Sequence, residues 1–233
     1  MTFYDRLLVE TAPARAGFLS IPLLGRALQG AVPKTLYVEF LTQAYHHVRH
    51  TCPLLALAAA RTGDPAYRAA LFTYVAEEQG HDSWILEDIA AMGGDADRVR
   101  REPARPPCRA MVAYAYYAIE WISPYALLGM VHVLEGMSVV LATKAAGALK
   151  DSLGKDSLAK DSSGPGGGAG FRYLTSHGDL DIGHVAFFQE LANSLEDPQA
   201  GEAIIDCANM MYGLYGNIFR DLGDRNGEHP NAA

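Results

Sequence analysis

The chain has 233 residues, of which 49% are apolar, and its formal net charge is −8. This length suits one large domain or two small ones, with enough apolar residues for a continuous core. The excess of acid argues against nucleic acid and against an anionic membrane surface as partners. Glu135 interrupts the stretch that comes nearest to a membrane span, Leu127 to Ala142, so no membrane-spanning segment is predicted.

The three cysteines, Cys52, Cys108 and Cys207, are far apart and share no metal-binding spacing. Such an odd, scattered set is typical of reduced thiols. The N-terminus lacks a basic region followed by an apolar run, so no signal peptide is predicted. We therefore expect a cytoplasmic protein.

Apolar residues recur at helical spacing, and proline and glycine mark the ends of the segments. The pattern predicts one or two short helices over 3–30, and longer helices over 33–61 with a kink at Pro53, from 65 to the Gly93-Gly94 pair, and over 108–122, 124–149, 171–195 and 198–222. Asp64-Pro65, Ser123-Pro124 and Asp197-Pro198 supply N-caps for three of them. The charged, proline-rich stretch 95–107 is predicted to be a connection.

Residues 150–170 are low in complexity, because Lys-Asp-Ser repeats precede a glycine-rich run. This composition predicts a flexible surface loop and no domain boundary. The tail 223–233 is predicted to be frayed. Since no alternating apolar and polar pattern indicates a strand, the sequence predicts a single all-α domain over 1–233, a bundle of about seven helices.

Two adjacent acids and a histidine lie in the predicted helix that begins at Pro65. Glu78 and His81 are three apart and Glu77 and His81 are four apart, so either pair falls on one helical face. That face is expected to be apolar, and a carboxylate there is costly unless it is paired or bound to a metal. A buried Glu–His hydrogen bond is the alternative to a metal site.

A single acid, Glu135, interrupts a helix that is apolar nearly all round and is therefore predicted to be buried. A buried lone carboxylate needs a strong partner, either a metal or His132 one turn away. Gly129 and Gly136 each lower helix propensity by about 1 kcal/mol, which indicates close backbone packing or room near Glu135.

A third group, His177, Asp181 and His184, falls on one face of the predicted helix 171–195. Two imidazoles and a carboxylate at this spacing suit Fe(II), Mn(II) or Zn(II). A surface His/Asp cluster is the alternative, and the apolar run that begins at Val185 argues against it. Such carboxylate-rich sets from separate helices are typical of dinuclear iron or manganese sites in bundle cores.

These motifs together resemble those of the heme-oxygenase-like diiron oxidases and oxygenases, within the superfamily of TenA-like thiaminases and the PqqC-like quinone-forming oxidase. In the diiron members, one helix carries a Glu and a His, a later helix supplies a Glu, and a final helix carries His-x3-Asp-x2-His. The matching residues here are Glu78, His81, Glu135, His177, Asp181 and His184. The resemblance covers roughly Leu36 to Phe219 and implies a seven-helix heme-oxygenase-like bundle with two non-heme iron ions, or manganese in their place.

Family members usually add a carboxylate from the first long helix, and here the sequence departs from that pattern. Gln43, His46 and His47 stand near the expected position. We favour His47, because a histidine can replace a carboxylate as a ligand, whereas Gln43 would hold a second metal poorly. Spacing likewise favours Glu78 over Glu77.

The resemblance implies an enzyme that activates O2 to oxidise a small organic substrate, such as an amino acid or another carboxylate, with electrons from an unidentified reductant. It also implies a homodimer. The predicted substrate pocket includes Arg49, as a partner for a substrate carboxylate, and four tyrosines, Tyr114, Tyr117, Tyr173 and Tyr212.

Two other functions are compatible with the sequence. A TenA-like hydrolase of thiamin fragments needs a nucleophilic cysteine beside a carboxylate, and none of the cysteines lies in a matching position. A metal- or ligand-binding helical protein without catalytic activity is the second. Metal analysis separates the diiron enzyme from both.

Overall fold

The computed structural model describes residues 1–157, 170–195 and 197–226, and the side chains of 154–157 and 176–182 lie outside this description. The described residues contain helices and no strand, which confirms the predicted all-α class. The helices are α1 (Phe3–Glu10), α2 (Ala12–Leu19), α3 (Pro22–Leu28), α4 (Lys34–Val48), α5 (Thr51–Arg61), α6 (Pro65–Glu78), α7 (His81–Ala91), α8 (Ala96–Arg101), α9 (Pro106–Tyr117), the π-helical turn η1 (Ala118–Ile122), the 3-10 turn η2 (Pro124–Ala126), α10 (Leu127–Ser157), α11 (Arg172–Ser194) and α12 (Pro198–Arg225).

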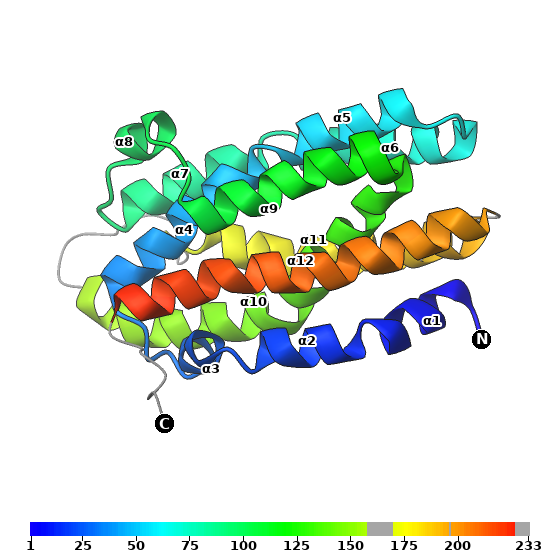
Figure 1. Cartoon of the computed structure of the whole chain (residues 1–233). Helices are drawn as coiled ribbons and strands as arrows, with labels where there is room; N and C mark the ends of the chain where they lie inside the picture. Colours follow the sequence, from blue (N-terminus) through cyan, green and yellow to red (C-terminus); the bar gives the residue numbers. More distant parts are fainter. Residues whose placement is uncertain (158–169, 196, 227–233) are drawn as a thin grey trace.

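The longer helices run side by side as a bundle (Figure 1). α10 packs against both α11 and α12, while α4 packs against α7 and α5 against α6. The short N-terminal helices α1 to α3 run along one side of the bundle and contact α10, α11 and α12. This arrangement places α6, α10 and α11, which carry Glu78, Glu135 and His184, in one bundle.

The long apolar helix α10 is a core helix of this bundle. The stretch Pro124–Leu153 is long and apolar enough to cross a membrane by composition alone, but half of its most apolar window is buried inside the protein. Gly129 allows the close approach of α12, because a Cβ at this position would lie 2.7 Å from the backbone nitrogen of Ala208. Gly136 faces open space, so close packing explains only one of the two glycines.

Three predicted helix starts are confirmed. The side chains of Asp64, Ser123 and Asp197 each accept a hydrogen bond from the backbone N–H two residues later. A proline follows each of them at the first helical position. These signals act locally and need no tertiary packing, which is why they are readable in the sequence.

Other predicted boundaries are wrong. The segment 33–61 breaks at 49–50 and not at Pro53, because proline is tolerated in the first turn of α5, where backbone N–H groups need no helical partner. The stretch 95–107, predicted to be a connection, contains α8, which Asp95 caps by accepting a hydrogen bond from the Arg98 backbone. The segment 3–30 holds three short helices.

The predicted loop 150–170 begins too early. α10 continues to Ser157, so the first two Lys-Asp-Ser repeats are helical, and residues 158–169 lie outside the described part of the chain. α12 likewise continues to Arg225, beyond the predicted end at Leu222, and 227–233 are not described. The C-terminal ends of α10 and α12 consist mostly of polar residues. Apolar periodicity therefore does not show that these residues are helical.

Candidate metal centre

The predicted helix that carries Glu78 and His81 is broken between the two residues. α6 ends at Glu78, Gly80 adopts a left-handed conformation with a φ of 93°, and α7 begins at His81. The prediction that both side chains share one helical face is therefore wrong. They are neighbours nevertheless, since Nδ1 of His81 lies 3.1 Å from Oε2 of Glu78. The turn requires a positive φ, which glycine adopts without steric cost and other residues adopt rarely.

Three helices bring donor atoms together around Glu78. One ligand atom each from Glu78, Glu135 and His184 lies within 4.8 Å of the other two. Nδ1 of His184 is 3.6 Å from a carboxylate oxygen of Glu78 and 3.7 Å from one of Glu135. The three side chains are only 5%, 14% and 9% exposed, respectively. Two acids this close in a buried position repel each other, so the arrangement favours a bound cation.

Glu77 contacts the opposite nitrogen of the same imidazole. Nε2 of His184 lies 3.2 Å from Oε2 of Glu77, whose side chain is half exposed. Tyr74 lies on α6, one turn before Glu78, and its ring packs against the imidazole of His184 with the ring centroids 4.8 Å apart. Both contacts orient His184 so that Nδ1 faces the buried acids. Glu78 therefore belongs to the buried cluster and Glu77 borders it.

His177 and Asp181 lie on α11, in the two turns before His184. Their helical spacing would place them on the same face as His184. Their side chains lie outside the described residues, so their role as ligands stays a prediction.

The structure distinguishes the three candidates on α4. His47 lines the same pocket as Glu78, and Gln43 and His46 do not. Oε1 of Gln43 accepts a hydrogen bond from the backbone N–H of Arg105, which turns this side chain toward the start of α9. His46 is buried elsewhere, and its burial lowers its pKa. His47 is thus the α4 residue whose placement fits the expected ligand.

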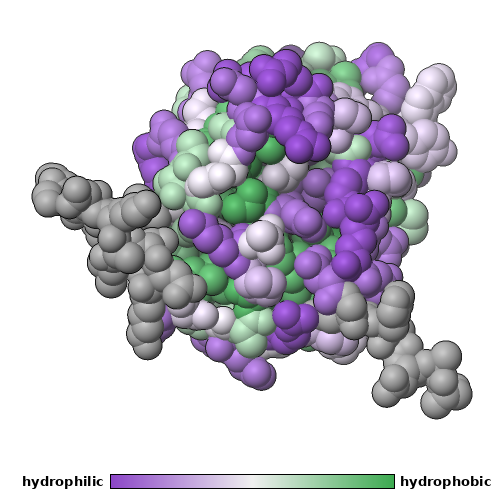
Figure 2. Space-filling view, turned by 90° about the vertical axis from the view of Figure 1, so that its left-hand side faces the viewer, coloured by the Kyte–Doolittle hydropathy of each residue, from purple (hydrophilic) through white to green (hydrophobic). Residues whose placement is uncertain are grey.

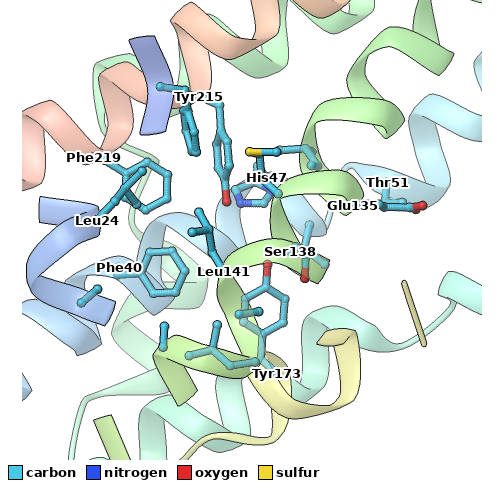
Figure 3. Close-up of a pocket in the computed structure, with 18 of the residues that line it drawn as sticks. Leu24, Phe40, His47, Thr51, Glu135, Ser138, Leu141, Tyr173, Tyr215 and Phe219 are labelled. Atoms are coloured by element: carbon cyan, nitrogen blue, oxygen red, sulfur yellow. The ribbon is translucent and has the colours of Figure 1, made fainter. Parts of the chain in front are cut away.

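A pocket of about 170 Å³ lies beside the cluster of Glu78, Glu135 and His184. Most of its lining side chains are apolar and come from α2 to α6 and from α10 to α12. Figure 3 shows Glu135 and Thr51 at one side of the pocket and apolar side chains such as Leu24 and Phe219 at the other. Among the described lining residues, Glu78 and Glu135 are acids and none is Lys or Arg. The pocket therefore joins an acidic end to a long apolar wall.

Five lining residues with polar groups, Tyr37, Thr51, Tyr74, Ser138 and Tyr215, were not expected from the sequence. Tyr74 precedes Glu78 by four residues, and Ser138 follows Glu135 by three. Helical spacing from a candidate ligand was therefore the signal that would have found two of them.

Of the predicted pocket residues, Tyr173 lines this pocket and the other four do not. Arg49 is exposed at the end of α4, with its guanidinium over a neighbouring tyrosine ring. Tyr114 and Tyr117 lie on α9, where Tyr117 is 54% exposed. Tyr212 packs on the side of α12 that faces Phe18. These four residues lie outside the lining of this pocket, since helical periodicity alone does not say which neighbour a helical face contacts.

The cysteines lie outside the pocket lining. Burial raises the pKa of all three thiols, to about 12 for Cys108 and for Cys207. They are therefore protonated near neutral pH, and a protonated thiol is a poor nucleophile.

The sequence profile of the family described as iron-containing redox enzymes matches residues 38–216. The chain belongs to this family. The match extends from α4 into α12 and so includes Glu78, Glu135 and His184. A comparison with curated proteins gives no significant match.

Solved structures share the fold of this iron-containing redox family member. A domain of unknown function with a heme oxygenase-like fold from Shewanella denitrificans OS217 aligns with a TM-score of 0.82 at 20% identity, covering 99% of this chain and 96% of that one. A TenA homologue from Pseudomonas syringae pv. tomato aligns with a TM-score of 0.76 at 12% identity, covering 95% and 93%. Heme oxygenase-1 from the cyanobacterium Synechocystis, solved with heme, aligns with a TM-score of 0.71 at 15% identity, covering 97% and 94%. These similarities confirm the predicted heme-oxygenase-like bundle.

Proposed function

We propose that the protein is a non-heme dinuclear iron oxidase or oxygenase that activates O2 to oxidise a small organic substrate. The observation that carries the proposal is the meeting of Glu78, Glu135 and His184 at the acidic end of an apolar pocket. Membership of an iron-containing redox family supports the redox chemistry. The same donors suit manganese, which is the alternative metal.

The number of candidate donors favours two ions. The set consists of three carboxylates and four imidazoles, from Glu78, Glu135, Asp181, His47, His81, His177 and His184. A single octahedral ion takes six ligands, and a catalytic ion leaves positions open. Seven protein donors exceed what one reactive ion needs, whereas two ions can share them and keep open positions.

The bound ions would supply the electrons that reduce O2, and the chain supplies position and environment. His81 holds one carboxylate oxygen of Glu78, which fixes the direction of the other. Glu77 accepts a hydrogen bond from Nε2 of His184 when that nitrogen is protonated, which leaves Nδ1 available for a metal. The apolar wall of the pocket excludes water from the site.

The pocket fits neither of two other chemistries of this fold. Heme carries two propionates that need positive partners, and the described lining contains two acids and no Lys or Arg. A hydrolase with a cysteine nucleophile needs a thiolate at the substrate, and the three cysteines lie outside the pocket lining with raised pKa values. Both observations favour the non-heme site.

The test is elemental analysis of protein produced with added iron, followed by measurement of O2 consumption. We expect close to two iron ions per chain, and a loss of iron in His184→Ala. Glu190→Ala removes an exposed acid from the same helix and should leave the iron content unchanged. Full iron content in His184→Ala, or iron loss in both variants, would contradict the assignment.

A further inference from the structure

The first turn of α11 has no cap of its own. The residue before it, Phe171, has an apolar side chain and makes no side-chain hydrogen bond to the helix. The first backbone N–H groups of a helix lack an intrahelical partner, and a polar side chain at the N-cap commonly accepts from them. α6 and α12 are capped in this way, by Asp64 and Asp197. The start of α11 therefore needs acceptors from another part of the chain.

Asp88 of α7 supplies these acceptors. Its Oδ1 accepts a hydrogen bond of 3.0 Å from the backbone N–H of Arg172, and its Oδ2 accepts one of 2.7 Å from the backbone N–H of Tyr173. α7 ends and α11 begins toward the end of the bundle that Figure 2 views, where hydrophilic side chains surround an apolar hollow. Asp88 itself is only 2% exposed. Both of its oxygens thus fasten the start of α11 to α7 inside the protein.

The side chain of Arg172 makes two further contacts with α7. Its guanidinium lies over the ring of Trp84, 4.4 Å from the ring centroid, and pairs with Glu87 at 2.7 Å. The pair with Glu87 is open to solvent and contributes little to stability. Trp84 also packs against His81, with the ring centroids 4.2 Å apart. One indole therefore contacts both the imidazole beside Glu78 and the first residue of α11.

His81, Trp84 and Asp88 lie on one face of α7, because they are three and four residues apart. This face begins at the candidate metal centre with His81 and ends at the first turn of α11. That turn carries Tyr173, which lines the pocket, and about three turns later α11 carries His184. α7 therefore supports two parts of the site that are far apart in the sequence.

We propose that Asp88 and Trp84 are positioning residues of the metal centre. Asp88 docks the first turn of α11 on α7, and Trp84 holds the imidazole of His81 and the guanidinium of Arg172. The effect on metal binding rests on the proposed function, in which His184 is a ligand, whereas the docking of α11 does not. Residues that orient metal ligands typically change the metal affinity by about 10–100-fold when they are replaced.

Hydrogen exchange of the metal-free protein, followed by NMR, tests the docking. The Thr175 N–H bonds to the Phe171 carbonyl as helices require, whereas the N–H groups of Arg172 and Tyr173 bond to Asp88. These two amides should exchange at least tenfold faster in Asp88→Ala than in the wild type. Unchanged exchange at both amides would overturn the docking role of Asp88.

Iron affinity, measured by chelator competition, tests the effect on the metal centre. Asp88→Ala should bind iron about 10–100-fold more weakly than the wild type. Asp88→Asn should lose less, because its amide oxygen still accepts one of the two hydrogen bonds. Trp84→Phe should likewise lose less than Trp84→Ala, because an aromatic ring remains beside His81.

Asp197→Ala is the matched control. It removes the cap of α12, a helix that carries none of the candidate ligands. Its melting temperature should fall, as that of Asp88→Ala should, but its iron affinity should stay within about twofold of the wild type. A merely structural role of Asp88 predicts the same iron affinity for the two cap variants when both are folded.

Three results would count against these proposals in different ways. Wild-type iron affinity in Asp88→Ala, together with fast exchange at Arg172 and Tyr173, would overturn the positioning role alone. Equal weakening in Asp88→Ala and Asp197→Ala would overturn it as well, since loss of stability would then explain the effect. If Asp88→Ala does not fold, Asp88→Asn is compared with Asp197→Ala in its place. A wild type that binds no iron would contradict the proposed function, and the exchange rates would still decide whether Asp88 docks α11.

Discussion

Glu135→Gln should change stability in opposite directions with and without metal. The substitution removes the charge of one buried acid and keeps its shape. Donor oxygens of Glu78 and Glu135 lie within 4.8 Å of each other. At this separation and an effective dielectric constant of about 20, two negative charges repel by about 3.5 kcal/mol. After partial screening, we expect the metal-free variant to be more stable than the wild type by about 1–3 kcal/mol.

The iron-loaded protein should show the reverse, because Glu135→Gln weakens a ligand and metal binding stabilises only the folded state. Urea unfolding with chelator and with iron under nitrogen measures both effects. For a chain of this length, 1 kcal/mol corresponds to a melting-temperature shift of about 2–4 °C. Glu190→Gln, an exposed acid on α11, is the matched control and should alter neither stability.

The reasoning is refuted if the metal-free Glu135→Gln protein is less stable than the wild type. That result would mean that Glu135 is held by hydrogen bonds within the core, as it would be if His132 were its partner. Breaking a buried pair of this kind costs about 3–5 kcal/mol. The sign of the change therefore decides between a metal ligand and a satisfied core acid.

Four further predictions concern other residues of the centre and its surroundings. His47→Ala should lose about one iron ion per chain by elemental analysis, while His46→Ala keeps both, since only His47 lines the pocket. Glu77→Ala should weaken iron binding by about 10–100-fold in a chelator competition assay and Glu77→Gln by less, because the amide oxygen still accepts a hydrogen bond from His184. Gly80→Ala should cost about 1–2 kcal/mol in urea unfolding, purely through its φ of 93°, since no atom within 4 Å would clash with the new methyl group. Burial, with a smaller contribution from Arg15, lowers the pKa of His132 to about 4, so the folded state binds this proton less readily than the unfolded chain does. Stability should therefore fall by about 3 kcal/mol as the pH drops from about 6.5 to 4, and His132→Phe should remove that part of the pH dependence.

Much of the fold was predictable because its signals are local. The caps at Asp64, Ser123 and Asp197 and the long apolar stretch of α10 depend only on neighbouring residues in the sequence. α8 was missed because it is a short helix with one buried apolar residue, Val99, and its start is marked by a polar contact, the Asp95 cap. A search for apolar periodicity does not detect such a helix.

The candidate site was predictable in its residue types and less so in its geometry. Glu78 and His81 are paired as expected, but across a break at Gly80, so the right pair was found from a wrong local structure. The choice on α4 required the structure, because adjacent residues such as His46 and His47 differ by about 100° around the helix. In a helix that is buried on most sides, apolar periodicity does not say which of the two directions faces the pocket.

The measurement that tests the central claim most directly is the iron stoichiometry of the wild type and of Glu135→Gln, prepared in parallel with added iron. We predict close to two iron ions per wild-type chain and a clear loss in Glu135→Gln, with both proteins folded by circular dichroism. Equal iron content in the two folded proteins, or a folded wild type that binds no iron, would contradict the account.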